Sequence, residues 1–476
     1  MTDATSTTPL NPGGQLEESQ VRHKEHVDDL TMLQSRMTTY FQTGDHAQAL
    51  SLARQIAARH PQRADSWRTL GAVQQSLNQW EDALTSYQKA VSLAPDDANV
   101  HCLYGDMLLR TEKYNEAYRA FARSVQIDPR HIRAGRVVVS MLVSSHRPKE
   151  AWAILQQLIP LSPGVLDLRL DAVRIALRLG ELQIARLHAS EAILLAPDQA
   201  AVHHVLGLLR MRTGDLPAAI SSFRDMLRLL QADAEFPRRD AVSTSYPFDY
   251  QAYEVLMWTT VAQLAQAGVH AFPTAGTLLG LMRDGHLLPF DKDVDVGLPF
   301  EEMGRAVAFL LANGWVELDP NAGLINPRAV RHPASGLLMD LCGYHTDKGA
   351  EISTGGLWME GVPMAWNRVV EFPVLSLHVT ERPEGRVWAL DQPETWLEAL
   401  YGDWRTPDPD FDTIIAAHNL RGFALLTQCY TLLRLAEQLR DGKLRKARAS
   451  ARVWLRHFPD DAQILQIASQ VDTALA

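Results

Sequence analysis

Residues 64–97 read ADSWRTLGAVQQSLNQWEDALTSYQKAVSLAPDD, and this stretch decides the fold of the first half of the chain. Two series of single residues around it recur at intervals of 34 residues. The members of the two series are Pro61, Pro95, Pro129, Pro163 and Pro197, and Ala49, Ala83, Ala117, Ala151, Ala185 and Ala219. Self-similarity at one fixed period indicates a repeat fold.

The quoted stretch resembles the tetratricopeptide repeat, a 34-residue unit of two antiparallel helices. The residues that carry the resemblance are Trp67, Leu70, Gly71, Ala83, Tyr87, Ala90 and Pro95. One neighbouring copy keeps Gly105, Ala117, Phe121 and Pro129, and another keeps Leu206, Gly207, Ala219 and Phe223. We therefore expect an all-α solenoid of about six repeats over residues 30–233, preceded by a flexible segment over residues 1–29.

Small residues such as Gly71 and Ala83 would let the two helices of a repeat approach closely, and the proline would end the second helix. Stacked repeats form an extended concave surface, so we expect the array to bind a protein partner in its groove. The alternative is a scaffold that binds nothing.

A similar signal returns near the end of the chain, where Ala447 and Pro459 are separated by 12 residues, as are Ala83 and Pro95. It predicts a helical pair like a tetratricopeptide repeat within residues 426–476, with helices over about 428–440 and 443–457. The second helix is basic, and its cationic residues are Lys443, Arg445, Lys446, Arg448, Arg452 and Arg456. This face would suit an anionic membrane surface or a phosphorylated acceptor, although such a charge run can also be a solvated helix face.

Between the two helical regions the pattern changes to proline, glycine and short runs typical of strands. We expect a linker over residues 234–250 and a separate α/β domain over residues 251–425. A helix at about 251–267 and a buried strand at 269–273 should open that domain. A helix from about Pro393 should end at Tyr401, with Gly402 as its C-terminal cap.

The chemistry concentrates in residues 274–296, which read TAGTLLGLMRDGHLLPFDKDVDV. Gly276 follows the expected strand, where it can make a sharp turn, and Thr277 offers a hydroxyl and a backbone N–H at a helix start. Because helix N-termini bind anions, we expect Gly276, Thr277 and Arg283 to hold the phosphates of a donor. Arg283 could instead pair with a nearby aspartate.

Three aspartates of this stretch alternate along an expected strand, so Asp291, Asp293 and Asp295 should project from one face. Their mutual repulsion would be relieved by a divalent cation, and ligands that are all oxygen suit Mg²⁺ or Mn²⁺. Asp340 lies in a second apolar run, residues 338–342, and would supply a further carboxylate borne on a strand. The predicted metal ligands are thus Asp291, Asp293, Asp295 and Asp340.

Three other readings of these aspartates are open. An EF-hand loop also begins Asp-x-Asp-x-Asp, and Glu302 falls at its twelfth position, but Val296 stands where that loop needs glycine. A nucleotide-sugar glycosyltransferase can hold its metal with a bare Asp-x-Asp, without the upstream glycine and arginine. The third reading is a solvated acidic turn that binds nothing.

Together these motifs resemble the LicD and fukutin-related phosphotransferases of the nucleotidyltransferase-fold superfamily. The resemblance rests on Gly-Thr-Leu-Leu-Gly at 276–280, on Arg283, on Pro-aromatic-Asp-x-Asp-x-Asp at 289–295, and on two downstream stretches at 339–341 and 401–404. It implies that Asp293, Asp295 and Asp340 are catalytic. It also implies a nucleotide-diphosphate donor, CDP-linked, whose phospho-alcohol group passes to a glycan or glycolipid hydroxyl.

Four tryptophans of this domain could form part of an aromatic cage for a quaternary ammonium group, or simply belong to the core. They are Trp358, Trp366, Trp388 and Trp396.

Composition limits the partners and the cellular compartment that we expect for the protein. The chain of 476 residues has 46% apolar residues and a net charge of −10, so nucleic acid is not the expected partner. No apolar run approaches the ~18 residues of a membrane helix, the N-terminus lacks a secretory signal, and three scattered cysteines form no disulfide pattern. We expect a cytoplasmic enzyme, with peripheral contact to the inner face of the membrane through the basic helix. The alternatives are an interaction protein whose transferase-like domain binds nucleotide without turnover, and a nucleotidyltransferase that modifies a protein or small molecule.

Overall fold

The computed structural model divides the chain into two compact units, Met1–Leu168 and Arg169–Ala476. The residues that the structure describes are 30–232, 236, 250–289, 291–318 and 323–476. The predicted segment 1–29 and nearly all of the predicted linker 234–250 lie outside this range, as does Phe290 of the aspartate motif.

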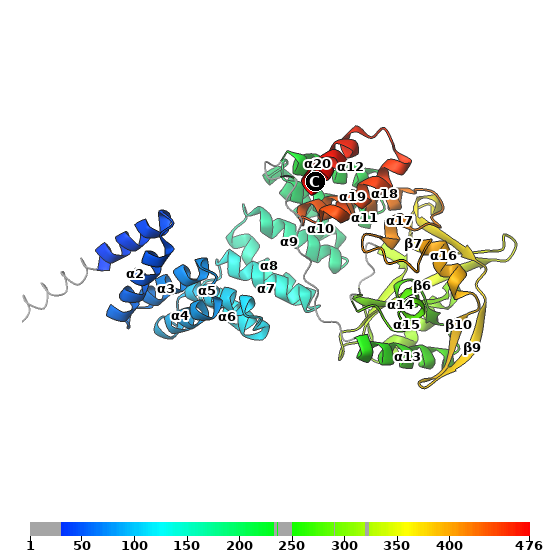
Figure 1. Ribbon diagram of the computed structural model, residues 1–476, viewed down its shortest axis with the longest axis horizontal. Helices are drawn as coiled ribbons and strands as arrows, with labels where there is room; N and C mark the ends of the chain where they lie inside the picture. Colours follow the sequence, from blue (N-terminus) through cyan, green and yellow to red (C-terminus); the bar gives the residue numbers. More distant parts are fainter. Residues whose placement is uncertain (1–29, 233–235, 237–249, 290, 319–322) are drawn as a thin grey trace, which may run out of the picture. The chain divides into compact units, whose positions relative to one another are not determined.

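Twelve consecutive helices form the tetratricopeptide solenoid (Figure 1). The first occupies residues 30–42. It is followed by α2 (His46–Arg59), α3 (Ala64–Ser76), α4 (Trp80–Leu93), α5 (Ala98–Arg110), α6 (Tyr114–Ile127), α7 (Ile132–Ser144), α8 (Pro148–Leu161), α9 (Leu166–Arg178), α10 (Leu182–Leu195), α11 (Ala200–Arg212) and α12 (Leu216–Gln231). The odd-numbered helices from α3 to α11 start 34 residues apart, and so do the even-numbered ones, which confirms the predicted period and the six repeats.

The recurring small residues sit where two helices of a repeat touch. All six alanines of the series, from Ala49 to Ala219, are 0% exposed. A Cβ on Gly71 would lie 2.9 Å from Tyr87 Cε1, and a Cβ on Gly207 would lie 2.3 Å from Phe223 Cε1. Glycine is therefore required for the close approach that the sequence predicted.

Three helices end the chain: α18 (Leu425–Arg440), α19 (Leu444–His457) and α20 (Ala462–Leu475). The first two confirm the predicted pair, and Ala447 is fully buried between them. The prediction of a pair alone was wrong, because α20 adds a third helix that buries Ile464 and Ile467 in the core with Trp454. Asp461 starts α20 by accepting the Ile464 N–H.

The C-terminal helices pack on the last repeat. Phe223 and Met226 of α12 share one core with Leu432 and Leu435 of α18, and Figure 1 shows α18 to α20 beside α12. Across this core, Arg224 Nη2 donates to Asp461 Oδ2 at 2.5 Å. The α/β domain is thus inserted between the sixth and seventh helical pairs.

The inserted domain is built on an eight-stranded sheet, whose main path is β1-β2-β6-β5-β3, with β7 joining β4, β6 and β8. Its elements are α13 (Tyr250–Gln266), β1 (Phe272–Pro273), α14 (Ala275–Arg283), β2 (Asp293–Pro299), η1 (Phe300–Glu302), α15 (Met303–Ala312), β3 (Val316–Glu317), β4 (Leu324–Asn326), β5 (Arg328–Arg331), β6 (Leu338–Asp347), β7 (Ile352–Met359), η3 (Met364–Trp366), β8 (Arg368–Pro373), the separate hairpin β9 (Leu377–Arg382) and β10 (Gly385–Leu390), α16 (Pro393–Tyr401) and α17 (Thr413–Ala416).

The predicted opening of this domain is largely confirmed. Helix α13 matches the expected helix, whereas the expected strand at 269–273 is reduced to Phe272 and Pro273. The strand is short because only these two residues pair with β2.

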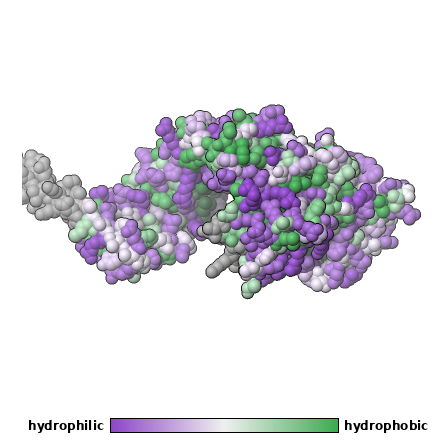
Figure 2. Space-filling view, turned by 90° about the horizontal axis from the view of Figure 1, so that it is seen from above, coloured by the Kyte–Doolittle hydropathy of each residue, from purple (hydrophilic) through white to green (hydrophobic). Residues whose placement is uncertain are grey.

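The sheet has different surroundings on its two faces. Val294 and Val296 of β2 are fully buried in a core made with α13 and α15, as the alternation of residues predicted. Helices α14 and α16 contribute to a second core, with Tyr344 and Phe372. None of the described helices is long and apolar enough to cross a membrane. The surface seen in Figure 2 is mostly hydrophilic, with smaller hydrophobic areas between.

Candidate active site

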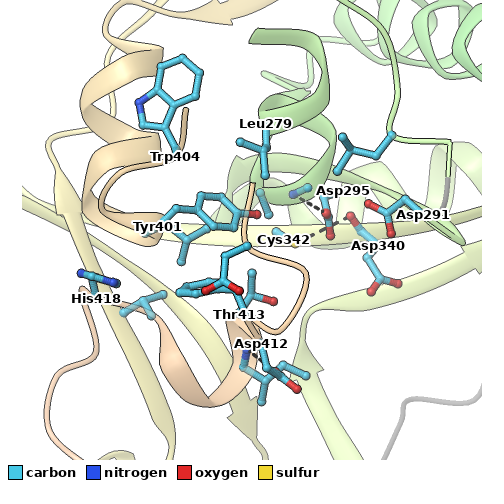
Figure 3. Close-up of a pocket in the computed structure, with 18 of the residues that line it drawn as sticks. Leu279, Asp291, Asp295, Asp340, Cys342, Tyr401, Trp404, Asp412, Thr413 and His418 are labelled. Carbon is cyan, nitrogen blue, oxygen red and sulfur yellow. Dashed lines mark hydrogen bonds between the residues drawn. The ribbon is translucent and has the colours of Figure 1, made fainter. Parts of the chain in front are cut away.

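A cavity of about 1220 Å³ lies over the carboxylates of β2 and β6. Six of the predicted site residues line it: Gly276, Arg283, Asp291, Asp293, Asp295 and Asp340. Thr277 does not line it and is only 2% exposed. Figure 3 shows Asp291, Asp295 and Asp340 grouped on one side of the cavity, with Tyr401 between them and His418.

The carboxylates come together because β2 and β6 are parallel neighbours. In their register Asp295 is the partner of Asp340, and Asp293 is the partner of Leu338. Asp293 and Asp295 are half-buried on the cavity face, while Val294 between them is buried on the other. The structure thus places Asp340 on a strand adjacent to the aspartate motif.

Burial and mutual repulsion raise the pKa of these carboxyl groups. Burial, followed by the charge of Asp293, raises the pKa of Asp291 to about 7. Burial and the charges of Asp293 and Asp291 raise the pKa of Asp340 to about 7. The pKa of Asp295 is raised by its burial and then by Asp293 and Asp340. Keeping all of them ionised costs free energy that a bound cation would offset.

Asp295 is held by the start of α14. The Gly276 N–H donates to Asp295 Oδ2 at 2.9 Å, and the Asp295 N–H donates to the Thr277 hydroxyl at 2.7 Å. These are the groups that the sequence assigned to donor phosphate. In the structure they orient a carboxylate of the site, and their contact with phosphate stays a prediction.

The sharp turn at the start of α14 is made by its first residue, Ala275, whose φ is 41°, and not by Gly276 as expected. Gly276 is required for another reason. A Cβ there would lie 2.7 Å from Asp291 Oδ2 and 3.2 Å from Asp295 Oδ2. The absence of a side chain gives the two carboxylates room beside the helix.

Arg283 ends α14 and lines the cavity, where it pairs with the next residue. Its Nε and Nη2 donate to the two carboxylate oxygens of Asp284 at 3.1 and 3.2 Å. The structure therefore shows the aspartate pairing that the sequence left open, and the phosphate contact of Arg283 stays a prediction.

The four aspartates are the residues of the cavity that could bind a divalent cation. In the part of the chain that the structure describes, no three histidine, cysteine, aspartate or glutamate side chains are arranged to hold a metal ion. The donor set nevertheless fits Mg²⁺ or Mn²⁺ in its chemistry, because it offers only carboxylate oxygens, whose pKa values are raised by burial and then by their neighbouring charges. Binding would require these side chains to turn toward one ion.

The residues at the end of α16 line the cavity, although the local sequence indicated only the end of a helix. Gly402 follows this helix with φ at 70°, which confirms the predicted cap. Tyr401, Asp403 and Trp404 all line the cavity, so this stretch belongs to the site as well as to the packing of the domain. Its match to the family pattern at 401–404 was the signal that could have indicated this role.

Other lining residues were missed because they meet only in three dimensions. Arg368 of β8 is 5% exposed and donates to the carbonyls of Thr413 and Ile414, both at 2.5 Å. Arg434 of α18 and Lys446 of α19 also line the cavity. No local motif marks any of these residues.

None of the four tryptophans considered for an aromatic cage lines the cavity. Trp358 and Trp396 are buried, and Trp396 packs against Phe372 in the core. The structure therefore supports the reading as core residues for Trp358 and Trp396, whereas Trp366 and Trp388 are half-buried.

Comparison with known families agrees with this architecture. Residues 268–329 match the model of the LicD/FKTN/FKRP nucleotidyltransferase domain. Residues 25–170 match the tetratricopeptide domain of cytochrome c-type biogenesis protein H, and residues 170–234 match a tetratricopeptide repeat model. The chain thus combines an N-terminal tetratricopeptide array with a transferase-like LicD-type domain.

Similarity to individual proteins is lower. Protein FlbA of Caulobacter vibrioides is 22% identical over 204 residues, which are 43% of this chain and 34% of that protein. The chain therefore aligns with about a third of that relative. Solved tetratricopeptide structures include Pseudomonas aeruginosa pilF (20% identity, TM-score 0.37, covering 44% of this chain and 95% of that one). Another is YrrB, described as having an unusual peptide-binding site (19% identity, TM-score 0.34, covering 38% and 93%).

Proposed function

We propose that the inserted domain is a metal-dependent phosphotransferase, which moves a phospho-alcohol group from a nucleotide-diphosphate donor to a hydroxyl of a glycan or glycolipid. One observation carries the proposal: Asp295 and Asp340 are register partners on parallel strands and line one cavity with Asp291 and Asp293. The match of residues 268–329 to a nucleotidyltransferase domain supports a transferase reaction. The CDP-linked nature of the donor rests on the family resemblance alone.

In this proposal Asp293 and Asp295 hold Mg²⁺ or Mn²⁺, Asp291 is a further ligand, and Asp340 either completes the ligand set or accepts the proton of the acceptor hydroxyl. The ion, when bound, supplies positive charge that neutralises the donor phosphates and the leaving nucleotide. Gly276 and Thr277 keep Asp295 oriented through their hydrogen bonds.

The transfer itself is a substitution at phosphorus. The acceptor oxygen forms a bond to the phosphorus of the transferred group, and the bond from that phosphorus to the nucleoside monophosphate breaks. The hydroxyl proton passes to a carboxylate, for which Asp340 is our candidate. Arg283, at the end of α14 in the same cavity, would exchange its contact with Asp284 for a donor phosphate.

Two further partners, a protein and a membrane surface, are proposed to bind outside the cavity and to take no part in the transfer. The repeats would bind a protein in their concave groove, as such arrays commonly do. The basic helix α19 would contact an anionic membrane, although part of its charge is already engaged. Lys443 pairs with Asp441 at 3.4 Å, and Arg448 pairs with Asp472 at 3.8 Å.

The test is a donor screen with the purified full-length protein. Nucleotide diphosphates carrying different alcohols are incubated with the protein in Mg²⁺, in Mn²⁺ or in EDTA, and nucleoside monophosphates are detected by mass spectrometry. Metal-dependent release from one donor class supports the proposal. Binding of donors without release from any of them would indicate a nucleotide-binding interaction module instead.

A further inference from the structure

The seventh helical pair contributes to the cavity of the inserted domain. Arg434 of α18 and Lys446 of α19 line it together with the carboxylates of β2 and β6. Helix α17, which forms part of the cavity wall, packs against both α18 and α19. A repeat-like element therefore supplies two positive charges to the candidate active site.

One salt bridge and three hydrogen bonds hold the start of α17, the part of the cavity wall that packs against α18 and α19. Arg434 Nε lies 3.3 Å from Asp412 Oδ2, and Asp412 Oδ1 accepts the Ile414 N–H at 2.9 Å. From the other side, buried Arg368 donates to the carbonyls of Thr413 and Ile414. The start of α17 is thus held between β8 and α18.

Lys446 differs from the other cations of the cavity. Arg283 and Arg434 pair with carboxylates, and Arg368 is bonded to two carbonyls. Among the described residues, the Lys446 ammonium has no ion pair or hydrogen bond, and its side chain is exposed to the cavity solvent.

The charge of the cavity makes such a cation useful. Eight aspartates line it against four cationic side chains. An anionic substrate entering this cavity meets repulsion, and a lysine without a carboxylate partner offers it a flexible point charge.

We propose that Lys446, together with Arg434 of the same cavity, binds a phosphate group of the substrate. This inference rests on the proposed function, because it names a second contact for the substrate in the same cavity. The phosphate could come from the nucleotide donor or from a phosphorylated acceptor. Either source would couple the C-terminal helical pair directly to substrate binding.

The test measures binding and does not require turnover. Full-length wild-type protein, Lys446→Gln and the control Lys443→Gln are titrated calorimetrically in Mg²⁺ at low salt. Both substitutions remove one positive charge, and Lys443 is exposed outside the cavity. The two probes are cytidine 5′-monophosphate and glycerol 3-phosphate.

We expect Lys446→Gln to weaken binding of at least one probe by about five- to tenfold, and Lys443→Gln to change it less than about twofold. Lys446→Arg should restore most of the affinity. Loss for cytidine monophosphate identifies the donor as the source of the phosphate, and loss for glycerol phosphate alone identifies the acceptor.

Equal affinities for wild type and Lys446→Gln with both probes would overturn the proposal, as would no wild-type binding at about 10 mM probe. Thermal unfolding of each variant shows whether the fold is retained. If donors release no nucleotide but Lys446→Gln still loses affinity, the proposed function fails and the phosphate site stands. If release occurs and the affinity is unchanged, the proposed function stands and the phosphate site at Lys446 is wrong.

Discussion

Asp295 of β2 and Asp340 of β6 are paired residues of adjacent parallel strands, and both line the same cavity. Neighbouring strands lie about 4.8 Å apart, so the fold itself holds two carboxylates at close range. Their repulsion must be relieved by protonation or by a cation. Activity, metal dependence and pH dependence should therefore all respond to changes at this pair.

Removing a carboxylate should abolish turnover while the fold persists. Asp293→Ala should lower kcat more than about a hundredfold, because a lost metal ligand removes several kcal/mol of charge stabilisation. For Asp295 the sharper variant is Asp295→Asn, which removes the charge but can still accept the Gly276 N–H. Steady-state kinetics in saturating Mg²⁺ measures the effect.

The matched control for these variants is Asp347→Asn, at the far end of β6 and exposed. It should keep near wild-type rates. If Asp293→Ala or Asp295→Asn does so as well, the metal assignment is wrong.

Stability without metal should fall as pH rises. An aspartate has a pKa of about 3.9 in the unfolded chain, whereas that of Asp340 is raised to about 7 in the fold. Between these values the folded state binds more protons, so its stability decreases with pH and levels off above about 7. Asp340→Asn should therefore exceed the wild type in Tm at pH 8, by roughly 2–6 °C, and match it near pH 4.

Thermal unfolding in EDTA across pH 4–8 measures this difference. Adding Mg²⁺ at pH 8 should raise the Tm of the wild type more than that of Asp340→Asn. A difference between the two proteins that does not depend on pH would contradict the assignment.

Gly276→Ala should impair the site more than the fold. The added Cβ would lie 2.7 Å from Asp291 Oδ2, so this carboxylate must move. We expect a loss of activity of at least about tenfold with only a small change in Tm, since the site geometry depends on positions within about an ångström. Gly304→Ala on α15 is the control, because its Cβ would meet nothing within 4 Å. Equal activities of the two variants would show that the glycine has no role in placing the carboxylates.

Arg283→Lys keeps the charge but loses the planar fork, so donor use should weaken by roughly ten- to a hundredfold. Arg283→Ala should be worse. Kinetics with donor and acceptor varied separately, with calorimetric donor binding in Mg²⁺, locate the effect. Normal donor binding combined with lost acceptor affinity would place Arg283 on the acceptor side.

The stability of a shortened chain should depend on the residue at which it starts. A chain of residues 243–476 loses α12 and exposes Leu432 and Leu435 of α18, so it should unfold at lower temperature or aggregate. A chain of residues 169–476 keeps the whole second unit and should turn over small acceptors. Thermal unfolding and light scattering compare the two. A stable, active 243–476 chain would show that α12 is dispensable.

The repeats could be predicted from the sequence because their signal is local and periodic. Ala83 and Pro95 recur with a fixed interval, and each repeat places them in the same surroundings. The shared face of the three aspartates could also be predicted, since alternation along a strand determines which side chains lie on the same side. The second apolar run around Asp340 predicted a strand, whereas its position beside the aspartate motif was implied only by the family resemblance.

What the sequence did not reveal depends on contacts between distant segments. Nothing near Lys446 shows that α19 reaches the cavity, because its basic neighbours resemble any solvated helix face. The need for glycine at 276 was predicted for the wrong reason, since the crowding by Asp291 exists only in the folded site. The third terminal helix was missed because α20 lacks the alanine and proline markers of a repeat.

The packing of α12 on α18 has a consequence for how the protein is made. Arg224 and its partner Asp461 are 237 residues apart in the chain. At a synthesis rate of 5–20 residues per second, the sixth repeat leaves the ribosome roughly 10–50 s before its partner helices exist. During that interval Phe223 and Met226 lack the α18 side of their core. Until α18 has been synthesised, the last repeat therefore exposes apolar side chains that could associate with other chains.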